Sequence, residues 1–241
     1  RVLVRSRGLG DVYKRQPLRS VWDHNPRRDG MLQRIVKWLI DNKIFARERT
    51  PNEVRAGGIL LYRGGLSLER AGEFLGVSHE AVREWYQKAS GMLFDVHRRM
   101  RKRIAIDEKE FLLGGETLYL WAAVDLDDNE RVLAVGVSYG RSYLEALSFL
   151  RKVRATCSGR RMPRVFVDGG NWYPCALQRL GFRHTVVEAF GPRSAIERFF
   201  SLVDHRIRCF FGRFPQRTYI DSIRRWFRAF AGLTNLERCL S

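Results

Sequence analysis

Residues 164–173 form the stretch best suited to chemistry, because a run typical of a buried strand ends there on a carboxylate. Residues 165–167 are apolar, Asp168 follows them, and Gly169 and Gly170 then signal a turn. A carboxylate at such a point costs desolvation free energy unless a cation pairs with it. Loops at the carboxyl ends of strands are also where open α/β sheets bind ligands. Asp168 is therefore predicted to help hold a metal ion.

Two distant acidic residues, Asp107 and Glu197, are predicted to complete this site. Asp107 lies inside a predicted strand at residues 104–108, and Glu197 lies one turn into a predicted helix that follows residues 190–192. Carboxylates are the ligands that Mg²⁺ and Mn²⁺ prefer. Two such ions about 3.5–4 Å apart can activate an attacking oxygen and stabilise the leaving oxygen in phosphodiester cleavage. The pattern alone leaves open whether the three residues meet in space.

Two neighbouring acids carry different expectations. Glu108 follows Asp107 directly, and adjacent strand residues point to opposite faces, so only one of the two is expected to face the site. Asp125 ends the next predicted strand and is the reserve ligand should Asp107 lie elsewhere.

The composition favours a nucleic-acid partner. The chain has 241 residues, of which 45% are hydrophobic, and can bury a large core. Its net charge is +18, and nucleic acid is the commonest acidic partner for such an excess. A membrane surface is the rival, but no stretch approaches the roughly 20 apolar residues that a spanning helix needs. The four cysteines lack metal-binding spacing, so we expect no zinc site and a reducing, cytoplasmic location.

The N-terminal residues have a separate interpretation. Residues 11–16 resemble the translation of the transposon mosaic-end adapter used in sequencing libraries, so residues 1–16 are predicted to be an artefact. The alternative is an ordinary basic N-terminal segment. A helical domain is then predicted over residues 17–97, with helices at 31–42 and from Pro51 to about Tyr62.

Residues 66–89 are predicted to form a helix-turn-helix within that domain. Ser67 and Ser78 suit helix N-caps, and Gly76 suits a C-terminal cap. In a DNA-binding helix-turn-helix the second helix enters the major groove. The alternative is a helical hairpin used only for packing. The outward residues of the second helix that are predicted to contact DNA are His79, Arg83 and Lys88.

Residues 98–103 form a basic segment where the helix signals give way to strand signals. Five of these six residues are cationic. A like-charge run is typical of a solvated linker, and between two domains it can also lie along phosphates. The predicted phosphate contacts are Arg98, Arg99, Arg101, Lys102 and Arg103.

The remaining residues, 104–241, alternate between strand and helix signals. Three meandering strands, a crossover helix, a fourth strand and further helices describe an α/β sheet that is covered on both faces. Strands are predicted at 104–108, 118–124, 131–137, 165–167 and about 184–187, and helices at 142–155, 172–180, about 193–211 and 220–233.

Over residues 22–235 the chain resembles DDE-type insertion-sequence transposases of the insertion-sequence-six group. The matching pieces are Gly65-Leu66-Ser67-Leu68, Gly76-Val77-Ser78-His79, Ile106-Asp107-Glu108, Tyr119 to Asp125, Gly140-Arg141-Ser142, Val167-Asp168-Gly169-Gly170, Arg193, Glu197-Arg198-Phe199-Phe200 and Trp226 to Phe230. The resemblance implies a ribonuclease-H-like fold, a mixed five-stranded sheet with flanking helices, preceded by an all-α helix-turn-helix domain. It also implies that Asp107, Asp168 and Glu197 are the DDE triad, which binds two Mg²⁺ or Mn²⁺ ions.

The function that this resemblance implies is transposition. Such an enzyme binds the terminal inverted repeats of its element, cleaves the ends and transfers the 3′-hydroxyl into double-stranded target DNA. Holding two ends together implies a homodimer or a higher oligomer, and the expected location is the cytoplasm, associated with the nucleoid. Two alternatives remain: a non-enzymatic helix-turn-helix regulator whose α/β domain senses a ligand, and a structure-selective nuclease of the same fold.

Three positions depart from the family pattern. Lys109 stands where the family has Thr, Ser194 where it commonly has Asn, and Asp204 where it usually has a basic residue that can contact DNA. These departures spare the triad, but they leave open an inactive copy. The basic residues of the same predicted helix that remain as predicted DNA contacts are Arg198 and Arg206.

Overall fold

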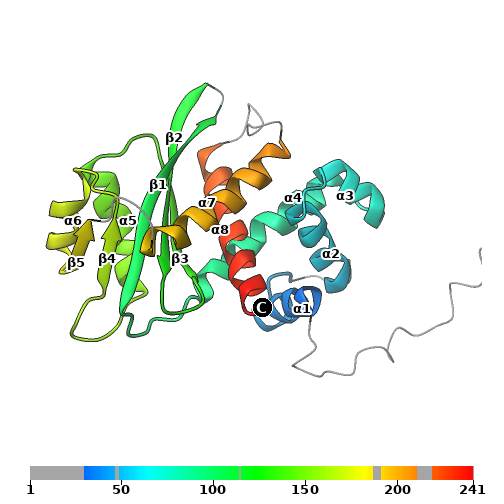
Figure 1. The fold of residues 1–241 in the computed structure, drawn as a ribbon. Helices are drawn as coiled ribbons and strands as arrows, with labels where there is room; N and C mark the ends of the chain where they lie inside the picture. The colour runs from blue at the N-terminus through cyan, green and yellow to red at the C-terminus, as the bar shows by residue number, and fades with distance from the viewer. Residues whose placement is uncertain (1–29, 47–48, 114, 187–190, 211–218, 241) are drawn as a thin grey trace, which may run out of the picture.

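The computed structural model describes residues 30–46, 49–113, 115–186, 191–210 and 219–240 (Figure 1). The segment at 1–16 and the first residues of the predicted helical domain lie outside this description. The N-terminal part consists of α1 (Met31–Asp41), α2 (Asn52–Arg63), α3 (Leu68–Leu75), α4 (His79–Lys88) and the 3₁₀ helix η3 (Ala89–Asp95).

Helices α3 and α4 are the two short, capped helices that the sequence predicts. The Ser67 hydroxyl accepts a hydrogen bond from the backbone N–H of Arg70 at 3.1 Å, and the Ser78 hydroxyl accepts one from that of Ala81 at 3.2 Å. Gly76 ends α3 with a φ of 67°, a left-handed conformation that glycine adopts without a Cβ penalty. That this hairpin reads DNA stays a prediction.

The strands form one mixed sheet in the order β3-β2-β1-β4-β5. The β1–β2 and β2–β3 pairs are antiparallel, whereas β1–β4 and β4–β5 are parallel. The predicted fold class, an α/β fold with a mixed five-stranded sheet and flanking helices after a helical N-terminal part, is confirmed. The strands are β1 (Arg103–Leu113), β2 (Glu116–Asp125), β3 (Val132–Ser138), β4 (Arg164–Val167) and β5 (Arg183–Val186).

Strand β1 is longer than predicted. It continues past Glu108 to Leu113, and its outer half pairs with β2 as a hairpin that rises beyond the neighbouring strands (Figure 1). The charged run at 108–110 hid this extension, because successive polar residues do not give the alternation expected of a half-buried strand.

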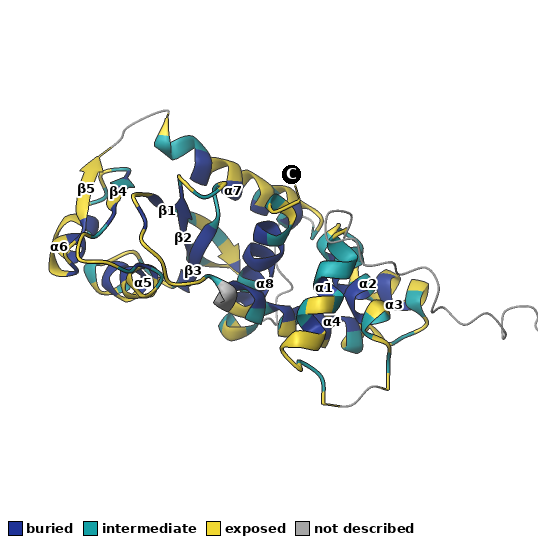
Figure 2. Cartoon of the chain, turned by 90° about the horizontal axis from the view of Figure 1, so that it is seen from below, coloured by how far each residue is buried: buried dark blue, intermediate teal, exposed yellow. Residues whose placement is uncertain are grey.

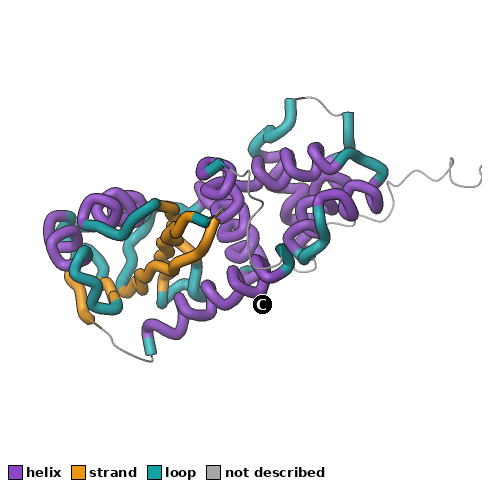
Figure 3. Tube along the Cα trace, turned by 90° about the horizontal axis from the view of Figure 1, so that it is seen from above, coloured by secondary structure: helices purple, strands orange, loops and turns teal. Residues whose placement is uncertain are grey.

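Helices cover both faces of the sheet (Figure 3). Helices α5 (Tyr143–Ala155) and α6 (Tyr173–Arg179) share a buried cluster with one face, and α7 (Pro192–Arg208) and α8 (Ile220–Arg238) share another with the opposite face. Among the described helices, none has both the length and the apolar character that crossing a membrane requires.

One hydrophobic core joins the N-terminal helices to the sheet. Ile59 of α2 and Tyr86 of α4 lie in the same buried cluster as Leu120 of β2 and Phe230 of α8. The Trp226 ring of α8 stacks on Phe230, and its centroid lies 6.1 Å from that of Tyr86. The helical part and the sheet are therefore held together by side-chain packing, and not only by the chain that connects them.

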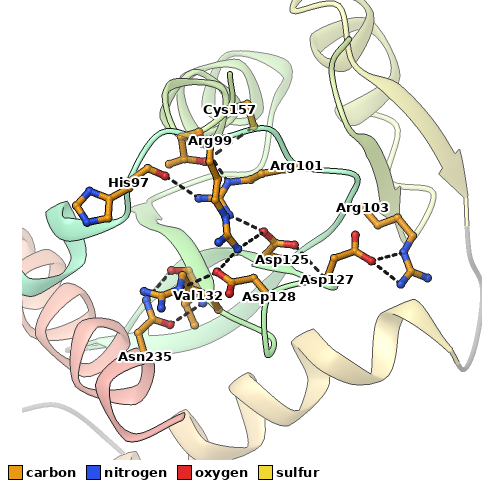
Figure 4. A network of polar contacts seen from close by, with 12 residues as sticks. His97, Arg99, Arg101, Arg103, Asp125, Asp127, Asp128, Val132, Cys157 and Asn235 are labelled. Carbon is orange, nitrogen blue, oxygen red and sulfur yellow. Dashed lines mark hydrogen bonds and ion pairs between the residues drawn. The ribbon is translucent and has the colours of Figure 1, made fainter. Parts of the chain in front are cut away.

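The basic segment at 98–103 is exposed at five of its six residues, but its Arg101 is buried, and polar contacts tie the segment to the end of β2 and the turn that follows (Figure 4). Arg101 is only 4% exposed, and its Nη1 lies 2.5 Å from Oδ2 of Asp125, which is itself buried. The prediction that Arg101 contacts phosphate is therefore wrong. Carboxylates near the β2–β3 turn pair with three of the five cations in this segment. The further ion pairs are Arg99–Asp128, Arg103–Asp127 and a longer contact of 3.7 Å between Arg99 and Asp125.

Replacing Asp125 by Asn is expected to lower the free energy of unfolding by about 3–5 kcal/mol, because it leaves a buried guanidinium without its counter-charge. Chemical denaturation followed by tryptophan fluorescence measures this loss. Asp127→Asn, in the same turn, breaks an exposed pair with Arg103 and should change stability little. Equal losses for the two variants would contradict the assignment.

Candidate active site

Asp107 and Asp168 lie close together because β1 and β4 pair in parallel. The register joins Ala105 to Phe166, so two further residues on each strand bring the two acids level. Asp107 is 7% exposed inside β1, and Asp168 directly follows β4. Together with Glu108 they offer three carboxylate oxygens that lie within 4.8 Å of one another. We call these three residues the acidic cluster.

The turn after β4 fixes the Asp168 side chain. Gly169 has a φ of 91°, which favours glycine, and the backbone N–H of Gly170 donates to Oδ1 of Asp168 at 3.1 Å. A Cβ on Gly170 would lie 2.6 Å from the Trp172 ring. The Gly-Gly pair therefore lets the loop fold back tightly and keeps the carboxylate at the end of the strand.

Crowding and burial raise the pKa of two acids of the cluster, Asp107 and Glu108. Burial and the nearby Asp168 carboxylate raise the pKa of Asp107 to about 7, and Arg193 opposes the shift. Burial is also the main cause of the raised pKa of Glu108. A divalent cation would stabilise the charged form of these groups, and an all-oxygen donor set suits Mg²⁺ and Mn²⁺.

Glu108 belongs to the cluster, contrary to the expectation from strand alternation. Its side chain is 2% exposed, and the Tyr173 hydroxyl donates a hydrogen bond to its Oε2. The described pairing of β4 with β1 ends at Ala105, so the long Glu108 side chain can reach around the strand toward Asp168. Alternation fixes the direction of Cβ, but not the position of the carboxylate three bonds further out.

Glu197 approaches the cluster from α7 and is separated from it by an arginine. The Glu197 side chain is 57% exposed, and its Oε1 lies 3.5 Å from Nε of Arg193. Nη2 of the same guanidinium lies 3.6 Å from Oδ2 of Asp107. Of the predicted triad, the structure thus brings Asp107 and Asp168 together and places Glu197 on the far side of Arg193.

Asp125, the reserve ligand, lies elsewhere. It pairs with Ile104, whereas Asp107 pairs with Ala122, so the two acids are three residues apart along the hairpin. Three residues of a strand span about 10 Å. Asp125 is also held by Arg101, and because Asp107 itself lies in the acidic cluster, the reserve ligand is not needed.

An arginine held between two aromatic rings borders the acidic cluster. Arg141, in the loop between β3 and α5, has its Cζ 5.1 Å from the Tyr119 ring centroid and 5.0 Å from that of Trp172. Its Nη1 lies 3.8 Å from Oε1 of Glu108, and its side chain is 46% exposed. Sequence reasoning gave Arg141 no role. The only signal was the Gly-Arg-Ser piece of the family resemblance.

Two of the departures from the family pattern are partners. Nζ of Lys109 on β1 lies 2.6 Å from Oδ2 of Asp204 on α7. Lys109 is two residues from Asp107, and Asp204 is two helical turns from Glu197. The changed charges therefore neutralise each other and link the two elements that carry Asp107 and Glu197.

The predicted DNA contacts divide into exposed and buried groups. Arg206 is 3% exposed; its guanidinium donates to the Tyr62 carbonyl at 2.6 Å and lies over the Phe210 ring. The prediction of DNA contact is therefore wrong for Arg206, which fills the buried face of α7. Arg198 is exposed and pairs with Glu130. Also exposed are His79, Arg83, Lys88, Arg98, Arg99, Lys102 and Arg103.

No protein-family model matches the chain. A curated relative, the uncharacterized protein MJ0017 of Methanocaldococcus jannaschii, is 36% identical over 211 residues, which cover 86% of this chain and 97% of the relative. The chain belongs to the MJ0017 family. This membership extends over nearly the whole archaeal protein and so takes in both the helices and the sheet.

Solved structures share the fold only distantly. A chain in the intasome of simian T-cell lymphotropic virus, in complex with the PP2A regulatory subunit B56 gamma, is 17% identical with a TM-score of 0.42; the match covers 70% of this chain and 67% of that one. The Mos1 transposase catalytic domain with raltegravir and Mn is 14% identical with a TM-score of 0.38, covering 65% and 90%. Likeness at this level assigns neither a site nor an activity to the MJ0017 family.

The raised pKa of Asp107 predicts a pH-dependent stability in the absence of metal. Its usual value of 3.8 rises to about 7 in the fold, so between these values the native state holds a proton that the unfolded chain has lost. This contribution to stability is complete below about pH 4 and is lost as the pH rises through 7. Asp107→Asn should therefore unfold at a higher temperature than the wild type at pH 8 in EDTA.

At pH 4 the two proteins should unfold at similar temperatures. Asp41→Asn on α1, where the side chain is exposed, is the matched control and should follow the wild type at both pH values. A constant difference between Asp107→Asn and the wild type across this range would contradict the perturbed pKa.

Proposed function

We propose that the chain is a DDE-type DNA transposase that binds the ends of its element, cleaves them and transfers the 3′-hydroxyl into target DNA. The observation that carries this proposal is the meeting of Asp107 and Asp168 where β4 ends in a ribonuclease-H-like sheet. The net charge of +18 supports a DNA partner, and the resemblance to insertion-sequence transposases supports the reaction.

Asp107, Asp168 and Glu197 would hold two Mg²⁺ or Mn²⁺ ions, with Glu108 as a fourth carboxylate beside them. The residues fit such ions, because three carboxylate oxygens already lie within 4.8 Å of one another and burial disfavours their charge without a cation. Bound ions of this kind supply an activated oxygen nucleophile and stabilise the leaving oxygen.

The protein groups would have distinct tasks around these ions. Asp107, buried in β1, is the fixed ligand, and the Tyr173 hydroxyl holds Glu108 in place. Glu197 would be the third ligand of the proposed triad, and its exposed carboxylate, now beside Arg193, is free of burial constraints on its rotation. Arg141, held between its two rings, would bind the phosphate next to the one that is cut.

DNA reading is assigned to α4, whose exposed residues include His79, Arg83 and Lys88. In this proposal residues 17–97 form the reading domain and residues 104–241 the catalytic domain. The working form is a dimer or a higher oligomer that holds two terminal inverted repeats, in the cytoplasm and associated with the nucleoid.

The decisive assay is strand transfer of a labelled 3′-end oligonucleotide, with Mg²⁺ or Mn²⁺ and with EDTA, by protein that starts at Pro17. Asp168→Asn should reduce metal-dependent joining by at least about 100-fold, because a metal ligand is lost, while DNA affinity stays within about twofold. Asp127→Asn is the matched control and should retain joining. Loss of DNA binding together with joining in Asp168→Asn would count against its role as a ligand.

The same assay separates the rival functions. Metal-dependent cutting without joining would identify a structure-selective nuclease. Salt-sensitive DNA binding without any reaction would leave a non-enzymatic regulator or an inactive copy.

Arg83→Ala tests the reading helix. If α4 lies in the major groove, the loss of this side chain should weaken binding to the element's own ends by about tenfold and binding to random DNA much less. Arg70→Ala, an exposed change on α3, is the control and should affect both DNAs similarly. Equal losses on both DNAs for Arg83→Ala would make it a phosphate contact.

A further inference from the structure

A groove runs along the outer edge of β3, the terminal strand of the sheet. It encloses about 480 Å³ and lies between the end of α5, the end of η3 and one side of α8. Its floor is apolar and includes Val135 and Phe227. The charged residues that line it are Lys152, Arg224 and Arg228.

Side chains of α8 already bind the backbone edge of β3 near its two ends. The Asn235 amide donates to the Val132 carbonyl at 2.8 Å and accepts from the Val132 N–H at 2.7 Å (Figure 4). Arg224 donates to the Val137 carbonyl at 3.2 Å. An added β-strand would have to displace these contacts. An occupant of the groove is therefore recognised by side chains rather than by strand pairing.

Like charges face one another across this groove. Burial lowers the pKa of Lys152, and the charges of Arg224 and Arg228 lower it further. Burial also lowers the pKa of Arg228. No carboxylate belongs to the described residues that line the groove, although Arg224 also pairs with exposed Asp221 at its border. Cations grouped over an apolar floor favour an anion that carries an apolar portion.

The cations continue from the groove toward α4. Arg225 of α8 donates to Oε1 of Gln87 on α4 at 2.6 Å, beside a hollow that Arg83, Lys88 and its ion-pair partner Glu84 also line. Figure 2 shows α5, β3, α8 and α4 in this order across one side of the molecule. A chain of regularly spaced anions matches this path better than a single small anion does, because the positive side chains follow one another over three helices.

We propose that the groove along β3 binds the sugar–phosphate backbone of DNA, with phosphates on Lys152, Arg224 and Arg228 and deoxyribose on the apolar floor. The inference rests on DNA being the partner in the proposed function, and it adds a surface away from the acidic cluster. Val135 pairs with Ala122, which pairs with Asp107. Two strand spacings, about 10 Å, therefore separate the β3 backbone from that of Asp107.

The test is the salt dependence of DNA binding by the full chain in EDTA, measured by fluorescence anisotropy with a labelled random-sequence duplex. Lys152→Gln/Arg228→Gln should lower the slope of log K against log salt by about 1–2, since each phosphate contact contributes about 0.9. Affinity at about 0.1 M salt should fall about tenfold. Arg224 is left in place because it also bonds the edge of β3.

Two further variants make the result interpretable. Arg179→Gln/Arg183→Gln removes the same charge at the opposite edge of the sheet and should keep the wild-type slope. Lys152→Arg/Arg228→Lys keeps both charges and should keep both slope and affinity. A loss of slope in this conservative variant would point to damaged folding and overturn the proposal.

An unchanged slope in Lys152→Gln/Arg228→Gln would also overturn the proposal, while metal-dependent joining by the same protein would leave the proposed function standing. If that variant instead loses binding of the anionic aromatic probe 1-anilinonaphthalene-8-sulfonate at wild-type slope, the groove takes a small anion. Failure of the wild-type chain to bind DNA would overturn both the groove and the transposase.

Discussion

The parallel pairing of β1 with β4 is the constraint on which the acidic cluster depends. It brings the buried Asp107 level with Asp168, so the Asp168 carboxylate makes the charge of Asp107 more costly. Close carboxylates of this kind can be stabilised by a proton, by a nearby guanidinium or by a metal cation. The raised pKa of Asp107 favours the proton, Arg193 provides the guanidinium at 3.6 Å, and the proposed function assigns the metal cation.

The helix α8 is the second organising feature. One side of it packs on β3 and the other on the N-terminal helices, and its aromatic residues lie in the core that both parts share. Its polar residues form hydrogen bonds with the backbone edge of β3 and line the groove. A single helix thus links the hairpin assigned to DNA reading, the sheet that carries the acids and the surface assigned to the DNA backbone.

Much of this architecture was predictable, because it depends on local signals. Apolar runs predict the strands. The capping residues Ser67, Ser78 and Gly76 predict the two short helices. Asp168 is singled out by its position before Gly-Gly. What sequence reasoning missed depends on tertiary contacts. The sequence alone predicts a solvated Arg101, because its partner Asp125 lies on a strand that comes beside it only in the folded chain.

The same limit explains the other corrections near the site. From the sequence Arg206 is predicted to contact DNA, but in the structure its guanidinium lies over the rings of Tyr62 and Phe210. Strand alternation predicts that Glu108 faces away from the site, but its long side chain brings the carboxylate close to Asp168. Lys109 and Asp204 read as two separate departures because 95 residues divide them along the chain. Their proximity is fixed by the packing of α7 on β1, which no local pattern encodes.

The shared core would constrain the spacing between the DNA sequence that is recognised and the bond that is cleaved. Tyr86 at the base of α4 and Trp226 of α8 are packed in one aromatic cluster, and α8 in turn rests on the sheet. Helix α4 and the acidic cluster are thus held at a set separation and cannot move apart as domains on a flexible linker would. If the proposed function holds, this fixed distance between α4 and the acidic cluster would set the number of base pairs between the recognised sequence and the cleaved bond.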